Sequence, residues 1–404
     1  MEKINKLYFK SPFESEDIEK YINNLQNKLD RPTINLIPSE NILTSNVRKA
    51  FLFDIGNRYH LPTNYLKNTM PSRKNLHDYL LKLTERLKKF YNCEWVDLRP
   101  ISGLNLMSTL LGALNDDFKH FASLGRPLGG HSVTQSLAKK FGYCVSNIPS
   151  KNKSLDFEEI KKLSKRNSGT FFYIDHSICL EIFDVNKLLS VLRKEDILFY
   201  DISHLNIFWA YEIEKIRDSR LLFGGTFHKS FPGPHKAFLG AYLKNKTIEK
   251  ISDFLDISVS SPHISNYIAL DFALKTMESA GRTYKEKIVY NANLLAKYLE
   301  KHYEVAKINS NEYTRTHQIW VKVSDFQNFT DDCAKIGLSV YRNFIPIWDS
   351  YHMRLGVQEI TYMGMSENHI EIIAKSIILA NKNNQYSKAG LMIKQLIKEV
   401  SKNG

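Results

Sequence analysis

The chain has 404 residues, of which 43% are hydrophobic and 12% aromatic, and its formal net charge is +13. This length and apolar content are enough for a large domain with a sizeable core and a second, smaller one. The lysines are spread along the whole chain without a dense basic block, so we expect no nucleic-acid partner.

The cysteines and the apolar runs narrow the class of protein further. No CxxC pair occurs, which argues against a zinc site and a disulfide framework and fits a reducing cytoplasm. The four cysteines are Cys93, Cys144, Cys179 and Cys333. The N-terminus lacks the apolar region of a secretory signal, and no run approaches 18 apolar residues. We therefore expect a cytoplasmic protein with no membrane span and no metal.

The first elements in chain order form an N-terminal arm, taken as residues 1–45. Ser15 can cap a helix over about 16–29, which has apolar residues at helical spacing. The large domain, taken as residues 46–280, is expected to open with two helices. These helices cover about 46–57 and 73–91, with a loop over 59–72 between them.

Short apolar runs alternate with helical stretches from about residue 95 to 245. The expected strands are 143–145, 170–174, 197–200 and 237–241, and the expected helices include 157–165 and 185–193. This alternation is typical of a mostly parallel sheet covered on both faces by helices. The sequence therefore predicts an α/β fold for this domain.

A smaller α+β domain is expected over residues 281–404. Two long helices, at 262–279 and 281–303, lead into it and are separated by Gly281. Its other expected elements are a strand at 318–323 and helices near 326–336 and 366–381.

Two polar residues stand at the ends of apolar runs in the large domain. Asp201 follows the run at 197–200, and Lys229 follows Thr226-Phe227-His228 just before a Pro-Gly-Pro turn. Ligands bind at the carboxyl ends of strands in open α/β sheets. Pyridoxal phosphate (PLP) needs a lysine for a Schiff base and an acid for its pyridinium nitrogen. Taken alone, Lys229 is also explained as a surface lysine, and Asp201 as an aspartate in a turn at the end of a strand.

Four further segments supply groups that such a cofactor and an amino acid would use. Ser102-Gly103 opens a helical stretch, where free N–H groups favour a phosphate. Gly129-Gly130-His131 could place an imidazole on a ring face, and Ser39-Glu40-Asn41 lies in a turn. Arg354 is suited to bidentate capture of a carboxylate. Each of these segments also has an explanation without a ligand: a capped helix for Ser102-Gly103, tight turns for the next two, and a surface position for Arg354.

Together and in this order, these segments resemble serine hydroxymethyltransferase, a PLP enzyme of the aspartate-aminotransferase fold (fold type I). Leu36–Asn41 resembles the family's LIASEN, Ser102-Gly103 resembles the start of its SGSQAN, and Gly129–His131 resembles the start of its GGHLTHG. Asp201–His204 resembles its DxAH, and Thr226–Lys229 resembles its TTTHK. Near the C-terminus, Asn343–Pro346 resembles its NxxP and Arg354–Gly356 resembles the start of its RxGTPA. The resemblance extends from residue 36 to about 375. It implies a large PLP-binding domain and a smaller C-terminal domain.

The resemblance also implies roles, position by position. Lys229 would hold PLP, Asp201 would keep the pyridine nitrogen protonated, and His131 would stack on the ring. His228 becomes a candidate for proton transfer. The other implied cofactor contacts are Ser102, Gly103, Ser177, His204, Thr226 and Ser261, the last in the segment that completes the phosphate site of a neighbouring subunit. The implied substrate contacts are Ser39, Tyr59 and Arg354.

The chain departs from the family where folate chemistry is concerned. After the tyrosine matched by Tyr59, the family has Ala-Glu-Gly, but Leu61 takes the place of the glutamate here. Leucine cannot transfer a proton, and His60 is the neighbouring residue that could replace it. Arg126 and Ser132 stand where the family has apolar residues around the pterin.

These observations predict a PLP-dependent transferase or lyase that makes or breaks the Cα–Cβ bond of a small α-amino acid. A folate-independent aldolase, transaldolase or hydroxymethyltransferase, assembled as a homodimer and using an aldehyde as second substrate, fits best. The alternatives are a tetrahydrofolate-dependent serine hydroxymethyltransferase, another PLP reaction such as transamination or decarboxylation, and a non-catalytic protein of the same fold.

Overall fold

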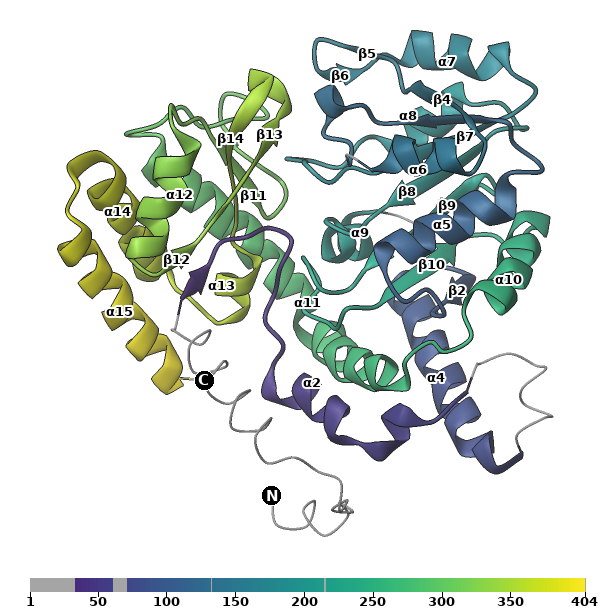
Figure 1. Ribbon diagram of the computed structural model, residues 1–404, viewed down its shortest axis with the longest axis horizontal. Helices are drawn as coiled ribbons and strands as arrows, with labels where there is room; N and C mark the ends of the chain where they lie inside the picture. Colours follow the sequence, from purple (N-terminus) through teal and green to yellow (C-terminus); the bar gives the residue numbers. More distant parts are fainter. Residues whose placement is uncertain (1–32, 61–70, 132, 214–215, 404) are drawn as a thin grey trace.

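The computed structural model describes residues 33–60, 71–131, 133–213 and 216–403 (Figure 1). The helix expected at 16–29, the loop containing Leu61 and the side chain of Ser132 lie outside these residues. Within the described part of the chain, no helix is both long and apolar enough to cross a bilayer.

A seven-stranded sheet forms the centre of the large domain, in the order β2-β10-β9-β8-β7-β3-β4. Its strands are β2 (Trp95–Asp97), β3 (His120–Ser123), β4 (Cys144–Asn147), β7 (Thr170–Ile174), β8 (Ile197–Asp201), β9 (Leu221–Thr226) and β10 (Ala237–Ala241). All neighbouring pairs are parallel except those made by β10, which runs antiparallel to β2 and β9. The mostly parallel sheet expected from the sequence is confirmed.

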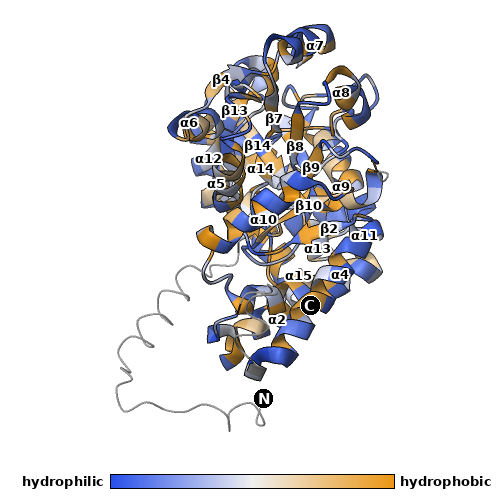
Figure 2. Ribbon diagram, turned by 90° about the vertical axis from the view of Figure 1, so that its right-hand side faces the viewer, coloured by the Kyte–Doolittle hydropathy of each residue, from blue (hydrophilic) through white to orange (hydrophobic). Residues whose placement is uncertain are grey.

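Helices cover both faces of this sheet because its central strands are apolar on both sides, as Figure 2 shows for β7 to β9. One face carries α5 (Gly103–Leu114), α6 (Thr134–Lys140) and α10 (Lys246–Ser258). The other carries α4 (Lys74–Phe90), α7 (Phe157–Arg166), α8 (Val185–Val191), α9 (Asn206–Glu212) and the first part of α11 (Ile264–Leu299). The helices expected at 73–91, 157–165 and 185–193 are thereby confirmed.

The smaller unit is built on an antiparallel sheet in the order β11-β14-β13. Its elements are β11 (Gln318–Val321), α12 (Phe326–Lys335), β12 (Leu338–Ser339), β13 (Tyr341–Ile345), β14 (Ser350–Gly356), α13 (Gln358–Tyr362), α14 (Glu367–Asn383) and α15 (Tyr386–Asn403). Strand β1 (Ile34–Asn35) pairs with β12, so this part of the predicted N-terminal arm joins the smaller unit.

Two expectations about helices are wrong. The stretch at 46–57 forms a short helix, α2 (Ser45–Lys49), followed by the 3-10 turns η2 (Ala50–Leu52) and η3 (Asp54–Asn57). Helix α11 runs without a break through Gly281, where two helices were expected. A Cβ at Gly281 would lie 2.5 Å from the Tyr211 hydroxyl oxygen, so the glycine permits close packing inside the helix. The predicted domain boundary at 280/281 therefore falls within one helix.

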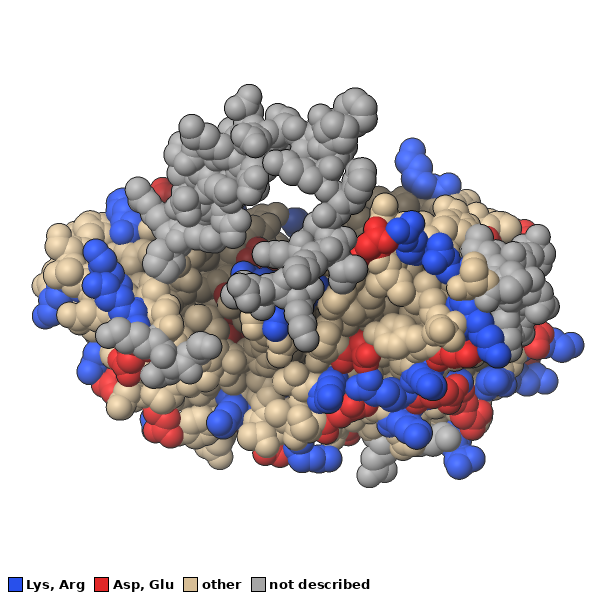
Figure 3. All heavy atoms as spheres, turned by 90° about the horizontal axis from the view of Figure 1, so that it is seen from below, with Lys and Arg blue, Asp and Glu red and all other residues tan. Residues whose placement is uncertain are grey.

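The remaining short elements lie in the loops between these helices and strands. They are β5 (Ser150–Lys151), β6 (Ser154–Leu155), η4 (Pro71–Arg73), η5 (Arg126–Leu128) and η6 (Pro346–Trp348). On the face seen in Figure 3, lysine and arginine side chains are interspersed with aspartate and glutamate.

Candidate active site

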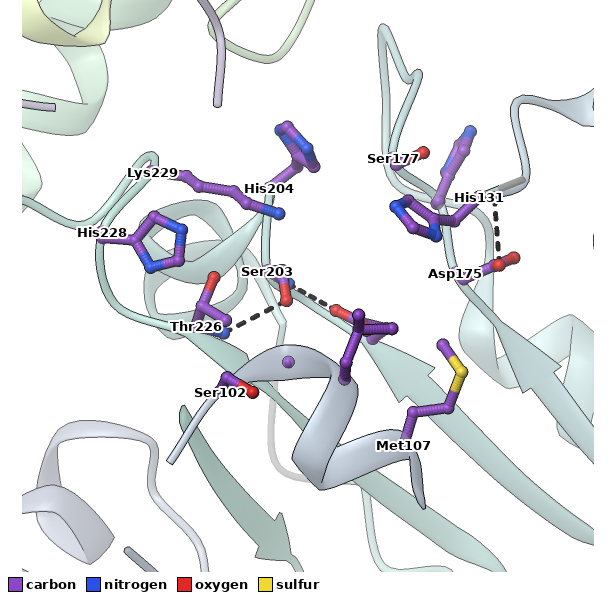
Figure 4. A pocket seen from close by; sticks show the side chains of 14 residues that line it. Ser102, Met107, His131, Asp175, Ser177, Ser203, His204, Thr226, His228 and Lys229 are labelled. Atoms are coloured by element: carbon purple, nitrogen blue, oxygen red, sulfur yellow. Dashed lines mark hydrogen bonds between the residues drawn. The ribbon is translucent and has the colours of Figure 1, made fainter. Parts of the chain in front are cut away.

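A cavity of about 250 Å³ opens at the carboxyl ends of the central strands (Figure 4). Its wall contains nine of the residues singled out from the sequence. They are Ser102, Gly103, His131, Ser177, Asp201, His204, Thr226, His228 and Lys229. Segments more than a hundred residues apart are thus brought to one place.

Lys229 lies three residues beyond the end of β9, with its amine in the cavity. The side chain of Asn41 donates a 2.7 Å hydrogen bond to the backbone carbonyl of Lys229, which ties the lysine to the N-terminal segment. Burial lowers the pKa of the amine to about 8; nearby Asp201 opposes this shift and Arg354 adds to it. An amine with such a pKa exchanges protons close to neutral pH.

Asp201 is the last residue of β8, and neighbouring groups fix its carboxylate. Oδ1 accepts a 2.8 Å hydrogen bond from the backbone N–H of Ser203, and Oδ2 accepts a 3.2 Å bond from the Tyr173 hydroxyl. The carboxylate therefore has a defined orientation at the cavity wall, as the partner of a protonated ring nitrogen requires.

The N-terminus of α5 forms another wall of the cavity. Ser102 caps this helix by accepting a hydrogen bond from the N–H of Asn105, and Gly103 is its first residue. A Cβ at Gly103 would lie 3.3 Å from the Thr226 methyl carbon, so a larger residue would press against the opposite wall. The free N–H groups and the dipole of this twelve-residue helix favour an anion such as a phosphate.

Four histidines line the cavity, and three of them, His131, His204 and His228, were predicted from the sequence. Lys229 and His131 point toward each other across the pocket in Figure 4. Burial lowers the pKa of His131 and of His204, and it lowers the pKa of His228 to about 3. His204 and His228 are therefore neutral near pH 7 and can each accept a hydrogen bond, although both are weak bases.

Arg354 lies beside this cavity on β14 of the smaller unit and is 4% exposed. Its Nη1 donates a 2.9 Å hydrogen bond to the backbone carbonyl of Ser177. The turn that carries Ser39 is held by Gln358, whose amide donates to the carbonyls of Ile37 and Glu40. These contacts bring the arginine and the serine turn to the smaller-domain side of the site.

Tyr59 and Ser261 lie elsewhere. They share a second, surface concavity with exposed Phe51, and neither lines the cavity around Lys229 in the same chain. His60 does not line that cavity either: its side chain is fully buried, and its Nε2 lies 3.2 Å from Nδ1 of His77.

Several residues of the site were not predicted from the sequence. Asp175, His176 and Ser203 line the cavity, and His317 stacks almost parallel to His204 with ring centroids 5.7 Å apart. Asp175 follows directly after β7, just as Asp201 ends β8. The rule that pointed to Asp201 could therefore have found it.

The polar groups of the cavity fit PLP. Thr226 Oγ1, His204 Nδ1 and His228 Nδ1 are buried and have no hydrogen-bond partner among the described residues. Unpartnered polar atoms of this kind are rare inside proteins, and all three residues line a cavity that a polar ligand can enter. With the lysine, the acid and the helix N-terminus, they match the amine-reactive, pyridine and phosphate parts of the cofactor.

Comparison with known proteins places the chain in a family. The family model of serine hydroxymethyltransferase matches residues 14–377. The chain belongs to the serine hydroxymethyltransferase family. It is therefore a PLP-dependent enzyme that acts on the Cα–Cβ bond of small amino acids, as the sequence motifs predicted.

Individual relatives carry two different names. An L-threonine:uridine-5'-aldehyde transaldolase from Amycolatopsis is 26% identical over 90% of this chain and 92% of the relative. A serine hydroxymethyltransferase from Archaeoglobus fulgidus is 27% identical over 88% of this chain and 84% of the relative. The crystal structure of L-threonine transaldolase from Pseudomonas fluorescens shares the fold, with a TM-score of 0.78, 24% identity and coverage of 95% and 93%.

Proposed function

We propose that this enzyme is a folate-independent transaldolase. It cleaves the Cα–Cβ bond of a β-hydroxy-α-amino acid such as L-threonine, releases acetaldehyde, and joins the remaining glycyl unit to an acceptor aldehyde. The bond electrons stay on Cα, the hydroxyl proton leaves with cleavage, and a proton is added to the acceptor oxygen as the new Cα–Cβ bond forms. The observation that carries the proposal is an intact cofactor cavity beside altered folate positions.

Different residues in and beside the cavity would bind different parts of the cofactor and the substrate. PLP, when bound, supplies an electron sink for the charge that develops on Cα. Lys229 would hold the cofactor, Asp201 would keep the ring nitrogen protonated, and Arg354 would bind the amino-acid carboxylate. The N-terminus of α5, with Ser102 and Gly103, would hold the phosphate. His131 would face the ring, with Ser177 and His204 at its oxygen side.

Proton transfer at the substrate hydroxyl needs a base inside the cavity. The pKa of Lys229, lowered to about 8, suits the amine to this role. His228 was the candidate from the sequence, but burial lowers its pKa to about 3 and makes it the weaker base of the two. His60 is enclosed with His77 in a different part of the same chain, which argues against it as this base.

Arg126 supports independence from folate. It stands where the family has an apolar residue at the pterin site, and its guanidinium lies 4.6 Å from the ring centre of Phe344. Its Nη2 also donates a 2.6 Å hydrogen bond to the Tyr351 hydroxyl. The Arg126 side chain thus packs against both aromatic residues. This surface is therefore charged and already in contact, and it does not form an open apolar slot for a pterin. The transaldolase names of several relatives agree with this interpretation.

We also propose a homodimer in which Tyr59 and Ser261 reach the partner's cavity. The two residues share one surface concavity, and it adjoins an apolar stretch in which Phe51, Leu52 and Phe53 are 44–56% exposed. A partner chain would cover this stretch.

Location in the cytoplasm stays a prediction from the cysteine content.

The test uses purified protein saturated with PLP. L-Threonine is supplied with uridine-5'-aldehyde or an aromatic aldehyde, and acetaldehyde and the new β-hydroxy-α-amino acid are quantified. We expect both products without tetrahydrofolate. Production of neither compound would refute the transaldolase.

A second candidate is the folate-dependent serine hydroxymethyltransferase, which the matching family model and several relatives favour. Serine and tetrahydrofolate distinguish the two. Glycine release from serine that requires tetrahydrofolate, without transfer from threonine, would establish the second candidate.

A further inference from the structure

Asp175 is a buried acid that none of the roles above uses. It lies one residue beyond the β7–β8 pair formed by Ile174 and Tyr200, next to the end of β8 where Asp201 stands. The residue is 3% exposed and contributes to the wall of the cavity. A carboxyl group in such a place needs partners, because burial without them is costly.

Its hydrogen bonds go to the segment that carries His131. Oδ2 accepts a 3.0 Å bond from the backbone N–H of His131 and a second bond from the Thr134 hydroxyl. Figure 4 shows the first of these bonds and places the carboxyl group behind His131 rather than in the open part of the pocket. One side chain thus binds the main chain of His131 on one side of position 132 and the side chain of Thr134 on the other.

The His131 segment has few other anchors of this kind. Val133, the N-cap residue of α6, has no capping side-chain bond. Upstream, the carbonyl of Gly129 accepts hydrogen bonds from the Ile178 N–H and the Ser177 hydroxyl, both 3.2 Å. Gly130 is packed so closely that a Cβ would lie 2.2 Å from the Leu124 carbonyl oxygen. The glycines are therefore held from one side. Among the described residues, Asp175 is the one side chain that bonds to both His131 and Thr134, which are also joined by a 3.4 Å backbone bond.

The charge state of Asp175 indicates which substitution is conservative. Burial and the nearby carboxylate of Asp201 raise the pKa of Asp175 well above its usual range, while the bonds from Thr134 and His131 oppose this shift. An asparagine oxygen can accept the same two hydrogen bonds as a neutral carboxyl group. An alanine cannot, and it leaves both donors without a partner.

We propose that Asp175 is a positioning residue, whose carboxyl group fixes the His131 main chain and thereby sets the imidazole against the face of the bound cofactor. The inference rests on the proposed function only through PLP, and it requires no particular amino-acid substrate. Asp175, after β7, would thus orient His131, whereas Asp201, after β8, would bind the ring nitrogen of the cofactor.

Asp196 provides a matched control at the opposite end of the same two strands. It is 2% exposed and accepts hydrogen bonds from the Ser164 hydroxyl and from the backbone N–H groups of Thr170 and Arg193. Its loss creates the same kind of defect, a buried acid removed from backbone and hydroxyl donors, far from the cavity mouth.

The experiment compares wild type, Asp175→Ala, Asp175→Asn, Thr134→Val and Asp196→Ala, without any amino acid. The dissociation constant of PLP is measured by fluorescence after reconstitution, and the orientation of the cofactor by the circular-dichroism band of the bound ring. We expect Asp175→Ala to raise the dissociation constant at least about tenfold and to weaken the band. Asp175→Asn should stay within about threefold of wild type, and Thr134→Val should fall between them.

Asp196→Ala should lower the unfolding temperature and leave both cofactor readouts unchanged. The inference is overturned if Asp175→Ala changes the cofactor readouts no more than Asp196→Ala does, or if Asp175→Asn loses as much as Asp175→Ala. Should Asp175→Ala fail to fold, an unchanged band in Thr134→Val overturns it. Wild-type protein that binds no PLP refutes the inference and the proposed function together, whereas PLP binding without threonine cleavage refutes only the transaldolase.

Discussion

Arg354 on β14 donates a 2.9 Å hydrogen bond to the backbone carbonyl of Ser177, which follows β7 of the large domain. The arginine proposed to bind the substrate carboxylate is thus oriented by the wall of the cofactor cavity. Burial lowers the pKa of this guanidinium to about 10, so it stays charged in the neutral range. A buried charge with an unpartnered Nε is well placed to bind an anion.

Arg354→Lys should therefore weaken binding of the amino acid and spare the cofactor. We expect KM for threonine to rise roughly 30- to 1000-fold, because the lysine amine cannot form the bidentate pair in a buried site. Initial rates and the visible spectrum of the enzyme check this. Arg315→Lys, at a half-exposed arginine, is the control. An unchanged KM would remove Arg354 from the substrate site.

Lys229→Met should stabilise the cofactor-free protein at neutral pH. The pKa of Lys229 is lowered from 10.5 to about 8, so between these values the unfolded chain binds a proton that the folded chain does not. Stability of the wild type therefore rises with pH across this window. The advantage of the methionine variant, at most about 3 kcal/mol, should be full below pH 8 and fade toward pH 10.5. Urea unfolding at pH 7 and pH 10 measures it, and an equal advantage at both would contradict the prediction.

Acid should unfold the protein partly through buried histidines. The pKa of His176 is lowered to about 3 by burial, and its ring stacks on Phe183 at 4.0 Å. Between pH 6.5 and 3 the unfolded chain takes up this proton and the folded chain does not, so stability falls as the pH falls. His176→Phe should reduce proton uptake on unfolding by about one at pH 5. The pH dependence of the urea midpoint tests this, and identical slopes for both proteins would refute it.

His60→Ala should affect stability far more than catalysis. The imidazole is fully buried beside His77, so its removal leaves a cavity and should cost about 2 kcal/mol. Activity per folded molecule should stay within about threefold, because the buried imidazole contacts His77 and is not exposed on the surface that carries Tyr59. Thermal unfolding and threonine cleavage are the two measurements. A loss of kcat of a hundredfold or more in folded protein would make His60 the missing acid after all.

Active-site complementation should reveal the proposed dimer. Lys229→Ala and Tyr59→Ala proteins are each expected to be inactive, because each lacks one component of every site. After mixing, unfolding and refolding, half of the dimers combine the two chains and hold one intact site, so about a quarter of wild-type activity should return. Absence of recovery, with dimers verified by light scattering, would place Tyr59 outside the partner's site.

The sequence predicted the core of the large domain well because strands such as Thr170–Ile174 are buried along their whole length and bounded by polar turns. The same uniform burial hides strand direction, which is why the antiparallel setting of β10 could not be predicted. Gly281 was misread as a helix end because the Tyr211 ring that packs against it comes from a distant segment.

The candidate site was predictable where strand ends and a helix N-terminus supply the groups. Lys229, Asp201 and Ser102 follow from local pattern and meet because parallel strands share one edge. The separate position of Tyr59 and Ser261 depends on how distant loops pack, which no local pattern records. The same holds for the bond between Asn41 and the Lys229 carbonyl.

Helix α11 is one continuous helix that contacts both the large domain and the smaller unit. It begins at Ile264, just after Ser261, and is bound to the large domain by a 2.6 Å ion pair between Glu278 and Arg86. Further along, the Tyr284 hydroxyl donates to the Gln358 carbonyl, four residues beyond Arg354. In the proposed dimer, with Ser261 at the partner's cavity, this one helix would connect the surroundings of Arg354 in one site with the segment that completes the other.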